Sequence, residues 1–282
     1  MDIGVVIFPT DQSIQPIELA KELEARGFES VWFPEHSHIP TSRETPWGGM
    51  KDAPPLPEMY WRSHDQFVAL TACAAVTEKL RVGTGITLVA QRDAIWLAKE
   101  AASLDMISGG RFELGIGYGW CVEEMRNHGL SYKARRDILR EKVLLVKELW
   151  TQDEASFSGE HIQFEKSWAW PKPVQKPHPP IVMGGAAGPK TAAHVAEFCD
   201  GWMPIGGFYD FDGGMTAIKA ACDEIGRDPA TIDIGMFYAM GFEADQLKVM
   251  ADKGAKRAIL PLPSEGADVV LPLLDDYVKH MH

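Results

Sequence analysis

The sequence predicts an α/β protein of the (β/α)8 barrel (TIM barrel) class, formed by a single domain over residues 1–282. Short β-branched or aromatic runs alternate with helical patterns to the end of the chain, and about eight such units fit its length. The strand runs are apolar throughout, which is typical of a parallel sheet buried on both faces. A doubly wound open sheet shows similar alternation but rarely needs eight units, so the closed barrel is favoured.

The first half of the chain predicts four strand–helix units. The helix over 14–27 illustrates the pattern, because apolar residues recur at helical spacing until Gly27 ends it. We expect strands over 3–8, 30–33, 80–89 and 111–117, and helices over 14–27, 66–77, 94–107 and 135–150. Residues 37–64, an insertion after the second strand, are rich in Pro, Gly and Trp and have no period. A loop this long is usually functional, and its aromatic residues indicate that it packs over something.

The second half of the chain predicts four further units after another insertion. This insertion follows the fourth strand unit and covers 155–180, with a hairpin over 155–164 that turns at Gly159 and a Pro-rich connector over 168–180. We expect strands over 180–184, 201–205, 232–238 and 258–261, and helices over 189–198, 214–225, 245–252 and 268–280.

The composition argues against some classes of binding partner and indicates the cellular compartment. The formal net charge is −12 and no dense Lys/Arg run occurs, so nucleic-acid binding is not expected. No apolar stretch is long enough to span a bilayer, and the N-terminus lacks the features of a signal peptide. The four cysteines are widely spaced, as buried thiols in a reducing compartment are. We therefore expect a cytoplasmic protein that acts on a small molecule.

Candidate catalytic residues end the second strand. In barrels of this class the active site lies at the C-terminal ends of the strands, and Glu35 and His36 fall there. His36 is an acid/base candidate, whereas Glu35 points the other way along an extended segment and is expected to orient or balance charge. His36-x-His38 also suggests a metal, but the fifth, sixth and eighth strands end without His, Asp or Glu. We expect no metal site.

Glycine-rich segments end the third, fourth and fifth strands. Gly115–Gly119 is not a dinucleotide fingerprint, because Trp120 stands where that motif needs glycine. Residues 184–191 differ from a P-loop in having Pro189 before the lysine. Small residues that lead into a helix N-terminus expose N–H groups that hold phosphate, while a tight turn is the alternative. Two such strand ends favour a phosphorylated cofactor. For the glycines at 83 and 85, a ligand contact and close packing stay equally open.

Several segments together resemble the luciferase-like monooxygenase superfamily of flavin and deazaflavin barrels, over nearly the whole chain. The most specific is SLDMISGGRFELGIG over residues 103–117. Five shorter segments also fit: PEH at 34–36, GTGI at 83–86, LAK at 97–99, PKPVQ at 171–175 and PIVMGG at 180–185. Within the superfamily, PW at 46–47 and YWR at 60–62 resemble its deazaflavin branch, which uses coenzyme F420.

The resemblance implies a cofactor site and a catalytic residue. It implies a non-prolyl cis peptide at Gly85–Ile86, in a bulge that supports the cofactor ring, and it places His36 near the reactive carbon of that ring. Residues implied to line the cofactor's phosphate and side chain are Gly117, Tyr118, Gly119, Gly184, Gly185, Ala186 and Ala187. The aromatic residues assigned to the substrate side are Phe8, Trp47, Trp61 and Trp120, with Tyr60 as a further candidate. Trp168 and Trp170 are expected to pack the inserted segment.

The resemblance also bears on the reaction. Relatives that oxidise sugar phosphates or simple alcohols carry a glutamate just after the strand-four glycines, where this sequence has Trp120. We therefore expect an apolar or conjugated substrate, and the identity of the proton donor stays open. The first hypothesis is two-electron hydride transfer with coenzyme F420. The alternatives are an FMN monooxygenase and a non-catalytic cofactor-binding barrel. Relatives often form dimers, so we expect a homodimer.

Overall fold

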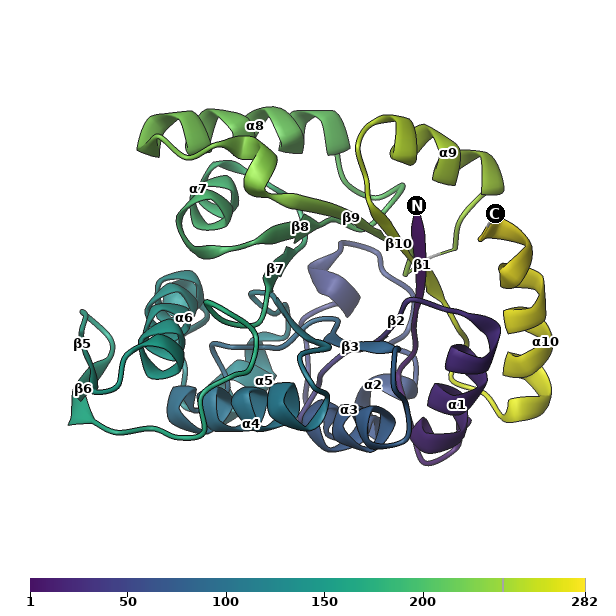
Figure 1. The fold of residues 1–282 in the computed structure, drawn as a ribbon, viewed down its shortest axis with the longest axis horizontal. Helices are drawn as coiled ribbons and strands as arrows, with labels where there is room; N and C mark the ends of the chain where they lie inside the picture. Colours follow the sequence, from purple (N-terminus) through teal and green to yellow (C-terminus); the bar gives the residue numbers. More distant parts are fainter. Residues whose placement is uncertain (240, 282) are drawn as a thin grey trace.

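The computed structural model describes residues 1–239 and 241–281, and it confirms the (β/α)8 barrel (Figure 1). The barrel closes in the order β1-β10-β9-β8-β7-β4-β3-β2, and every pairing in it is parallel. The barrel strands are β1 (Asp2–Val6), β2 (Ser30–Phe33), β3 (Arg81–Thr84), β4 (Phe112–Ile116), β7 (Ile181–Gly184), β8 (Gly201–Met203), β9 (Asp233–Phe237) and β10 (Arg257–Pro261).

Helices surround the barrel (Figure 1). The longer ones are α1 (Pro16–Arg26), α3 (Gln66–Ala75), α4 (Ala94–Ile107), α6 (Arg135–Thr151), α7 (Pro189–Phe198), α8 (Phe211–Ile225), α9 (Ala244–Asp252) and α10 (Ala267–Tyr277). Each corresponds to an expected helix. The short helices α2 (Met59–Arg62) and α5 (Val122–Asn127) were not expected, because so few residues show no helical period. Short 3-10 turns are η1 (Trp47–Gly49), η2 (Tyr132–Ala134), η3 (Pro229–Thr231) and η4 (Val278–His280).

The strand β3 is shorter than expected. It ends at Thr84 rather than at residue 89, and beyond it only Thr87 makes an isolated bridge, to Ile116. Glycine weakens a strand, and Gly85 stands where the ladder stops. The peptide bond between Gly85 and Ile86 is cis, as the family resemblance implies.

Trp32 fills the interior of the barrel. Its indole is fully buried and donates a hydrogen bond from Nε1 to Ser30 Oγ at 2.8 Å. A Cβ on Gly83 would lie 2.5 Å from this ring, so only glycine fits beside it on β3. For Gly83, close packing rather than ligand contact explains the glycine. The remaining interior is filled by Val6, Val182, Met203 and Ile259, with Phe237 packed against them.

The second insertion follows the fourth strand–helix unit, as expected. The antiparallel hairpin of β5 (Ala155–Ser158) and β6 (Gln163–Ser167) lies between α6 and β7, and it turns at Gly159 as expected. The expectation that Trp168 and Trp170 pack this segment is wrong, because they are 77% and 57% exposed. Among the residues described, no helix combines the length and the apolarity that a membrane crossing requires.

Candidate active site at the mouth of the barrel

A cavity of about 600 Å³ opens at the C-terminal ends of the barrel strands. Its walls bring together most of the residues that the sequence singles out. These are Phe8, Glu35, His36, Trp47, Gly85, Ile86, Gly117, Tyr118, Gly119, Trp120, Gly184, Gly185 and Ala186. The position is the one where barrels of this class build their active sites.

Two predicted site residues lie outside this cavity. Trp61 is 47% exposed and does not line the cavity, and Ala187 is buried beside it without reaching its surface. Tyr60, the neighbour of Trp61, lines the cavity instead. Its ring lies 5.2 Å from His36 and 4.6 Å from Phe8, centroid to centroid. The short helix α2 turns Tyr60 rather than Trp61 toward the mouth, and that helix was not expected.

His36 is held by a carboxylate from a different loop. Its Nδ1 atom lies 2.8 Å from Oε2 of Glu124, which is on α5. Both side chains are at least 95% buried. An ionised carboxylate only accepts hydrogen bonds, so the imidazole donates from Nδ1. Nε2 makes no hydrogen bond within the described residues, and the ring forms part of the cavity wall.

The charge on Glu124 is stabilised by its neighbours. Burial raises the pKa of this carboxyl, but hydrogen bonds from His36 and Ser37 outweigh burial, and the net pKa is lowered. The backbone N–H of Ser37 donates to Oε1 at 3.1 Å, and its hydroxyl lies 3.3 Å from the same atom. Glu124 is therefore an ionised, positioned acceptor for His36, as the carboxylate of a catalytic triad is for its histidine.

Ser37 extends this network to two more histidines. Its Oγ lies 2.9 Å from Nδ1 of His38 and 2.8 Å from Nε2 of His128. His128 caps the C-terminal end of α5 and is exposed. Burial is the main cause that lowers its pKa. The hydrogen-bonded chain thus runs from the cavity wall at His36 to the protein surface at His128.

The Glu35 carboxylate is bound by residues that follow β3. It accepts a hydrogen bond from the backbone N–H of Leu88 at 2.7 Å and pairs with Nε of Arg92 at 2.5 Å. Arg92 also pairs with Asp65 and Glu100. These contacts tie the segment after β2 to the segment after β3, which gives Glu35 a structural role beside His36.

A second, polar cavity of about 400 Å³ lies on the other side of His36. Glu35 and His36 line both cavities. Within the described residues, the side-chain Nε2 atoms of His64, Gln66 and Gln91 are buried here without a hydrogen-bond partner. Buried polar groups of this kind are usually satisfied by ordered water. His36 thus stands between an aromatic cavity and a polar one.

Glu123 fastens the long loop after β2 over the mouth. Its carboxylate accepts hydrogen bonds from the backbone N–H groups of Glu44 and Thr45 and, at 2.7 Å, from the hydroxyl of Thr45. Burial alone raises its pKa, but these donors lower it to about 2. Trp47 follows directly in the loop and packs edge-on against Tyr60, with centroids 5.8 Å apart. The loop forms an aromatic lid over His36, and the Glu123 carboxylate holds it at residues 44 and 45.

The opposite side of the mouth is basic. Arg135 and Arg136, the first residues of α6, line the cavity beside Tyr118 and the loop after β7. Among the described residues neither arginine forms an ion pair, and Nε of Arg135 is buried without a partner. A Cβ on Gly185 would meet nothing within 4 Å, so its backbone is open to the cavity. The helix α7 begins nearby at Pro189, and helix N-termini favour anions.

Neither the Glu124 contact nor this arginine pair was expected from the sequence. Glu124 lies four residues beyond Trp120, and only the turn of α5 brings it back to His36. The Arg-Arg pair at the start of α6 is visible in the sequence, and two adjacent arginines at the beginning of a helix are a signal for phosphate binding.

Comparison with known proteins identifies relatives over nearly the whole chain. The sequence profile of the family described as luciferase-like monooxygenase matches residues 9–259. An uncharacterized protein of Mycobacterium tuberculosis is 36% identical over 270 residues, which is 95% of this chain and 94% of that protein. The F420-dependent hydroxymycolic acid dehydrogenase of the same organism is 27% identical over 266 residues, which is 91% of this chain and 65% of that protein.

Solved structures show the same fold. The monooxygenase RslO1 from Streptomyces bottropensis superposes with a TM-score of 0.78 at 22% identity. The superposition covers 100% of this chain and 98% of the monooxygenase chain. An F420-dependent secondary alcohol dehydrogenase, solved with an F420-acetone adduct, superposes with a TM-score of 0.76 at 18% identity, with 99% and 98% covered. At these identities the likeness shows the fold alone.

Proposed function

The chain belongs to the luciferase-like monooxygenase family, whose members are oxidoreductases or monooxygenases, and from this premise we propose that it is an oxidoreductase that uses coenzyme F420 for hydride transfer. The observation that carries the proposal is the pairing of His36 with Glu124 at the cavity wall. Hydride transfer to a carbonyl or from an alcohol must be matched by transfer of a proton, and an oriented imidazole supplies that group. The F420-dependent relative at 27% identity supports the choice of cofactor.

The residues of the mouth fit a phosphorylated cofactor with a flat ring. Arg135 and Arg136 offer guanidinium groups without carboxylate partners in the described chain, and Gly185 offers open backbone. These groups, with the N-terminus of α7, would hold phosphate. The apolar residues Ile86 and Leu88 line the wall toward His36 and would support the ring. A bound deazaflavin would supply or accept a hydride, and the protein would bind and orient the cofactor and the substrate.

In this proposal His36 is the residue that accepts or donates the proton. The Glu124 carboxylate keeps Nδ1 protonated and oriented, so Nε2 is the atom that accepts a proton from a substrate hydroxyl or donates one to a carbonyl oxygen. In oxidation, the alcohol loses a hydride from carbon and a proton from oxygen, and Nε2 takes that proton. In reduction, both steps run in reverse. The aromatic lid of Trp47 and Tyr60 would shield this contact from water on the side of the mouth.

The lid also limits the substrate. The walls near His36 are aromatic, with Phe8, Tyr60 and Trp120 grouped around the imidazole. Position 120 is a tryptophan and supplies no carboxylate, and the carboxylate of Glu124 already pairs with His36. We propose an apolar or conjugated carbonyl, imine or alcohol as the substrate class.

Titration of the protein with F420 and with FMN tests the cofactor. Cofactor fluorescence and intrinsic tryptophan fluorescence both report binding, and the expected result is micromolar or tighter binding of F420 with weaker binding of FMN. Tight FMN binding with no response to F420 would overturn the proposal in favour of a monooxygenase.

A substrate screen with oxidised and reduced F420 then tests catalysis. Conjugated carbonyls, imines and alcohols are followed through the absorbance of the cofactor, and His36→Ala is the matched variant. It should bind F420 like the parent protein and lose turnover roughly 10²- to 10⁴-fold, the usual contribution of an acid/base residue. Equal turnover of both proteins would instead favour a barrel in which His36 has no catalytic role.

A further inference from the structure

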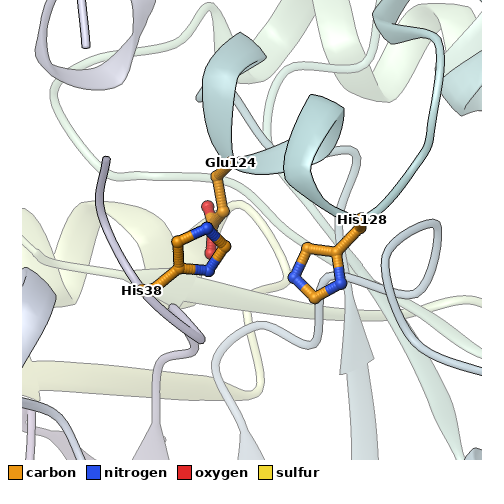
Figure 2. A group of neighbouring side chains, drawn as sticks. All are labelled: His38, Glu124 and His128. Atoms are coloured by element: carbon orange, nitrogen blue, oxygen red, sulfur yellow. The ribbon is translucent and has the colours of Figure 1, made fainter. Parts of the chain in front are cut away.

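Behind His36, three side chains bring ligand atoms together. The ring nitrogens of His38 and His128 and a carboxylate oxygen of Glu124 all lie within 4.8 Å of one another. Figure 2 shows that Glu124 and His128 come from one helical segment and His38 from the loop that faces it. These atoms come from α5, from its C-terminal cap and from the loop after β2.

The local structure explains why these atoms converge. Glu124 and His128 are four residues apart on α5 and its C-terminal cap, a spacing that puts two side chains on one face of a helix. His38 follows β2 by only a few residues, and its ring centroid lies 5.6 Å from that of His128. Glu124 is fully buried, whereas His128 is exposed and open to solvent.

We propose that His38, Glu124 and His128 form a binding site for a divalent transition metal ion of the zinc class. Two imidazoles and one carboxylate, with a fourth position left for water, are the donor set of open zinc sites. A hard cation such as Mg²⁺ or Ca²⁺ prefers oxygen ligands and is disfavoured by the two nitrogens. Tetrahedral zinc places its ligands roughly 3.4 Å apart, so the exposed ring of His128 closes inward when the ion binds.

The hydroxyl of Ser37 lies where the proposed ion would sit, so it rotates away when the ion binds. This hydroxyl contacts all three groups, at 2.9 Å, 2.8 Å and 3.3 Å, which places one polar atom where the three donors converge. Asn127 supplies an outer contact, because its amide nitrogen lies 2.9 Å from Nε2 of His38. With the amide turned over, its oxygen accepts a hydrogen bond from Nε2–H and leaves Nδ1 as the ligand, a common outer contact of metal-bound histidine.

The site shares its carboxylate with the proposed acid/base residue. Oε2 of Glu124 faces His36, and Oε1 faces Ser37 and the two other histidines. An ion on Oε1 neutralises much of the carboxylate charge that holds Nδ1–H of His36. Bound metal therefore weakens the basicity of His36 and lowers turnover. This effect on turnover rests on the proposed function, whereas binding of the metal does not.

Calorimetric titration of chelator-treated, untagged protein with zinc chloride tests the site. The expected result is one equivalent bound at micromolar or tighter affinity, with little heat from magnesium chloride. Cobalt(II) gives a second readout, because a tetrahedral cobalt site with nitrogen ligands absorbs strongly in the visible. His128→Ala should lower zinc affinity at least 10-fold, and because His128 is exposed the variant keeps the fold.

The matched control is His161→Ala, which removes another exposed histidine, in the turn between β5 and β6. It should bind zinc like the parent protein. Failure of the parent protein to bind one equivalent, or equal affinities of the His128 and His161 variants, would overturn the site. If zinc binds as expected but F420 does not bind, the site stands and the proposed function fails.

Discussion

The carboxylate of Glu124 accepts a hydrogen bond from Nδ1 of His36 across 2.8 Å, although the two residues lie 88 positions apart in the chain. The contact joins the loops that follow two different barrel strands, β2 and β4. It fixes which nitrogen of His36 carries a proton and which faces the cavity. The first prediction tests this contact directly.

Replacement of Glu124 by Gln should disorient His36 without changing the fold. The amide cannot carry the charge that stabilises a protonated imidazole, so turnover should fall roughly 10²-fold. Nitrogen-15 NMR of labelled histidine reports the tautomer, and Nδ1 of His36 should lose its fixed proton. Glu124→Asp should keep part of the contact and recover part of the turnover. Unchanged ring shifts in the Gln variant would show that Glu124 does not position His36.

Replacement of Arg136 by Ala should weaken cofactor binding. Its guanidinium lines the mouth and forms no ion pair within the described chain, so it is free for phosphate. We expect about 10-fold lower F420 affinity, or about 1.4 kcal/mol. The control Arg140→Ala, on the same helix, removes an arginine already paired with Glu197 and should leave affinity unchanged. Equal losses of F420 affinity in both variants would show that the overall positive charge of the protein, and not a specific phosphate site, attracts the cofactor.

Much of this architecture follows from sequence pattern, and the exceptions have physical causes. The barrel strands are short apolar runs that alternate visibly with helical patterns, and His36 stands at a strand end that the fold class makes important. Glu124 was missed because α5 is six residues long and shows no period, while Tyr60 and Trp61 differ only in the rotation of a four-residue helix. Side-chain direction within one short turn depends on tertiary contacts.

Removal of the Glu123 carboxylate should release the aromatic lid. Glu123 accepts three hydrogen bonds from Glu44 and Thr45, and Ala offers none. Hydrogen–deuterium exchange over residues 43–50 should increase roughly tenfold in Glu123→Ala, and the KM for an apolar substrate should rise. The control Glu160→Ala removes an exposed glutamate far along the chain, and it should change neither the exchange rate nor the KM. If exchange in the lid stays at the parent rate, another contact holds the loop.

Acid should destabilise the fold through His194. Burial lowers the pKa of this histidine to about 4, and its Nδ1 lies 2.8 Å from the hydroxyl of Tyr118. Between pH 6.5 and 4 the unfolded chain binds a proton that the folded chain does not, so the free energy of unfolding falls as pH falls through this window. The loss should stay below about 1.4 kcal/mol per pH unit, because solvent screens part of the effect.

Urea denaturation at pH 7, 5.5 and 4.5 measures this loss. His194→Gln removes the titrating group and should give a flatter pH dependence than the parent protein. The same slope in both proteins would assign the acid sensitivity to other groups.

An apolar surface on α4 predicts self-association. Ile95, Trp96, Met106 and Ile107 are between 47% and 68% exposed, and Val68 on the adjoining α3 is 71% exposed. Exposed apolar groups of this extent commonly mark a protein interface. Trp96→Glu should convert a dimer to a monomer in light scattering, while Val249→Glu on α9 should not. A monomeric parent protein would rule out the dimer.

Because β1 pairs with β10, the barrel can close only after β10 has been synthesised. Residues 2–6 remain without one strand partner until residues 257–261 have been made. His36 and Glu124 both leave the ribosome long before that point, so a nascent chain holds the histidine and its carboxylate on an open, unclosed sheet. Chains that stop before residue 257 would expose two strand edges and invite aggregation.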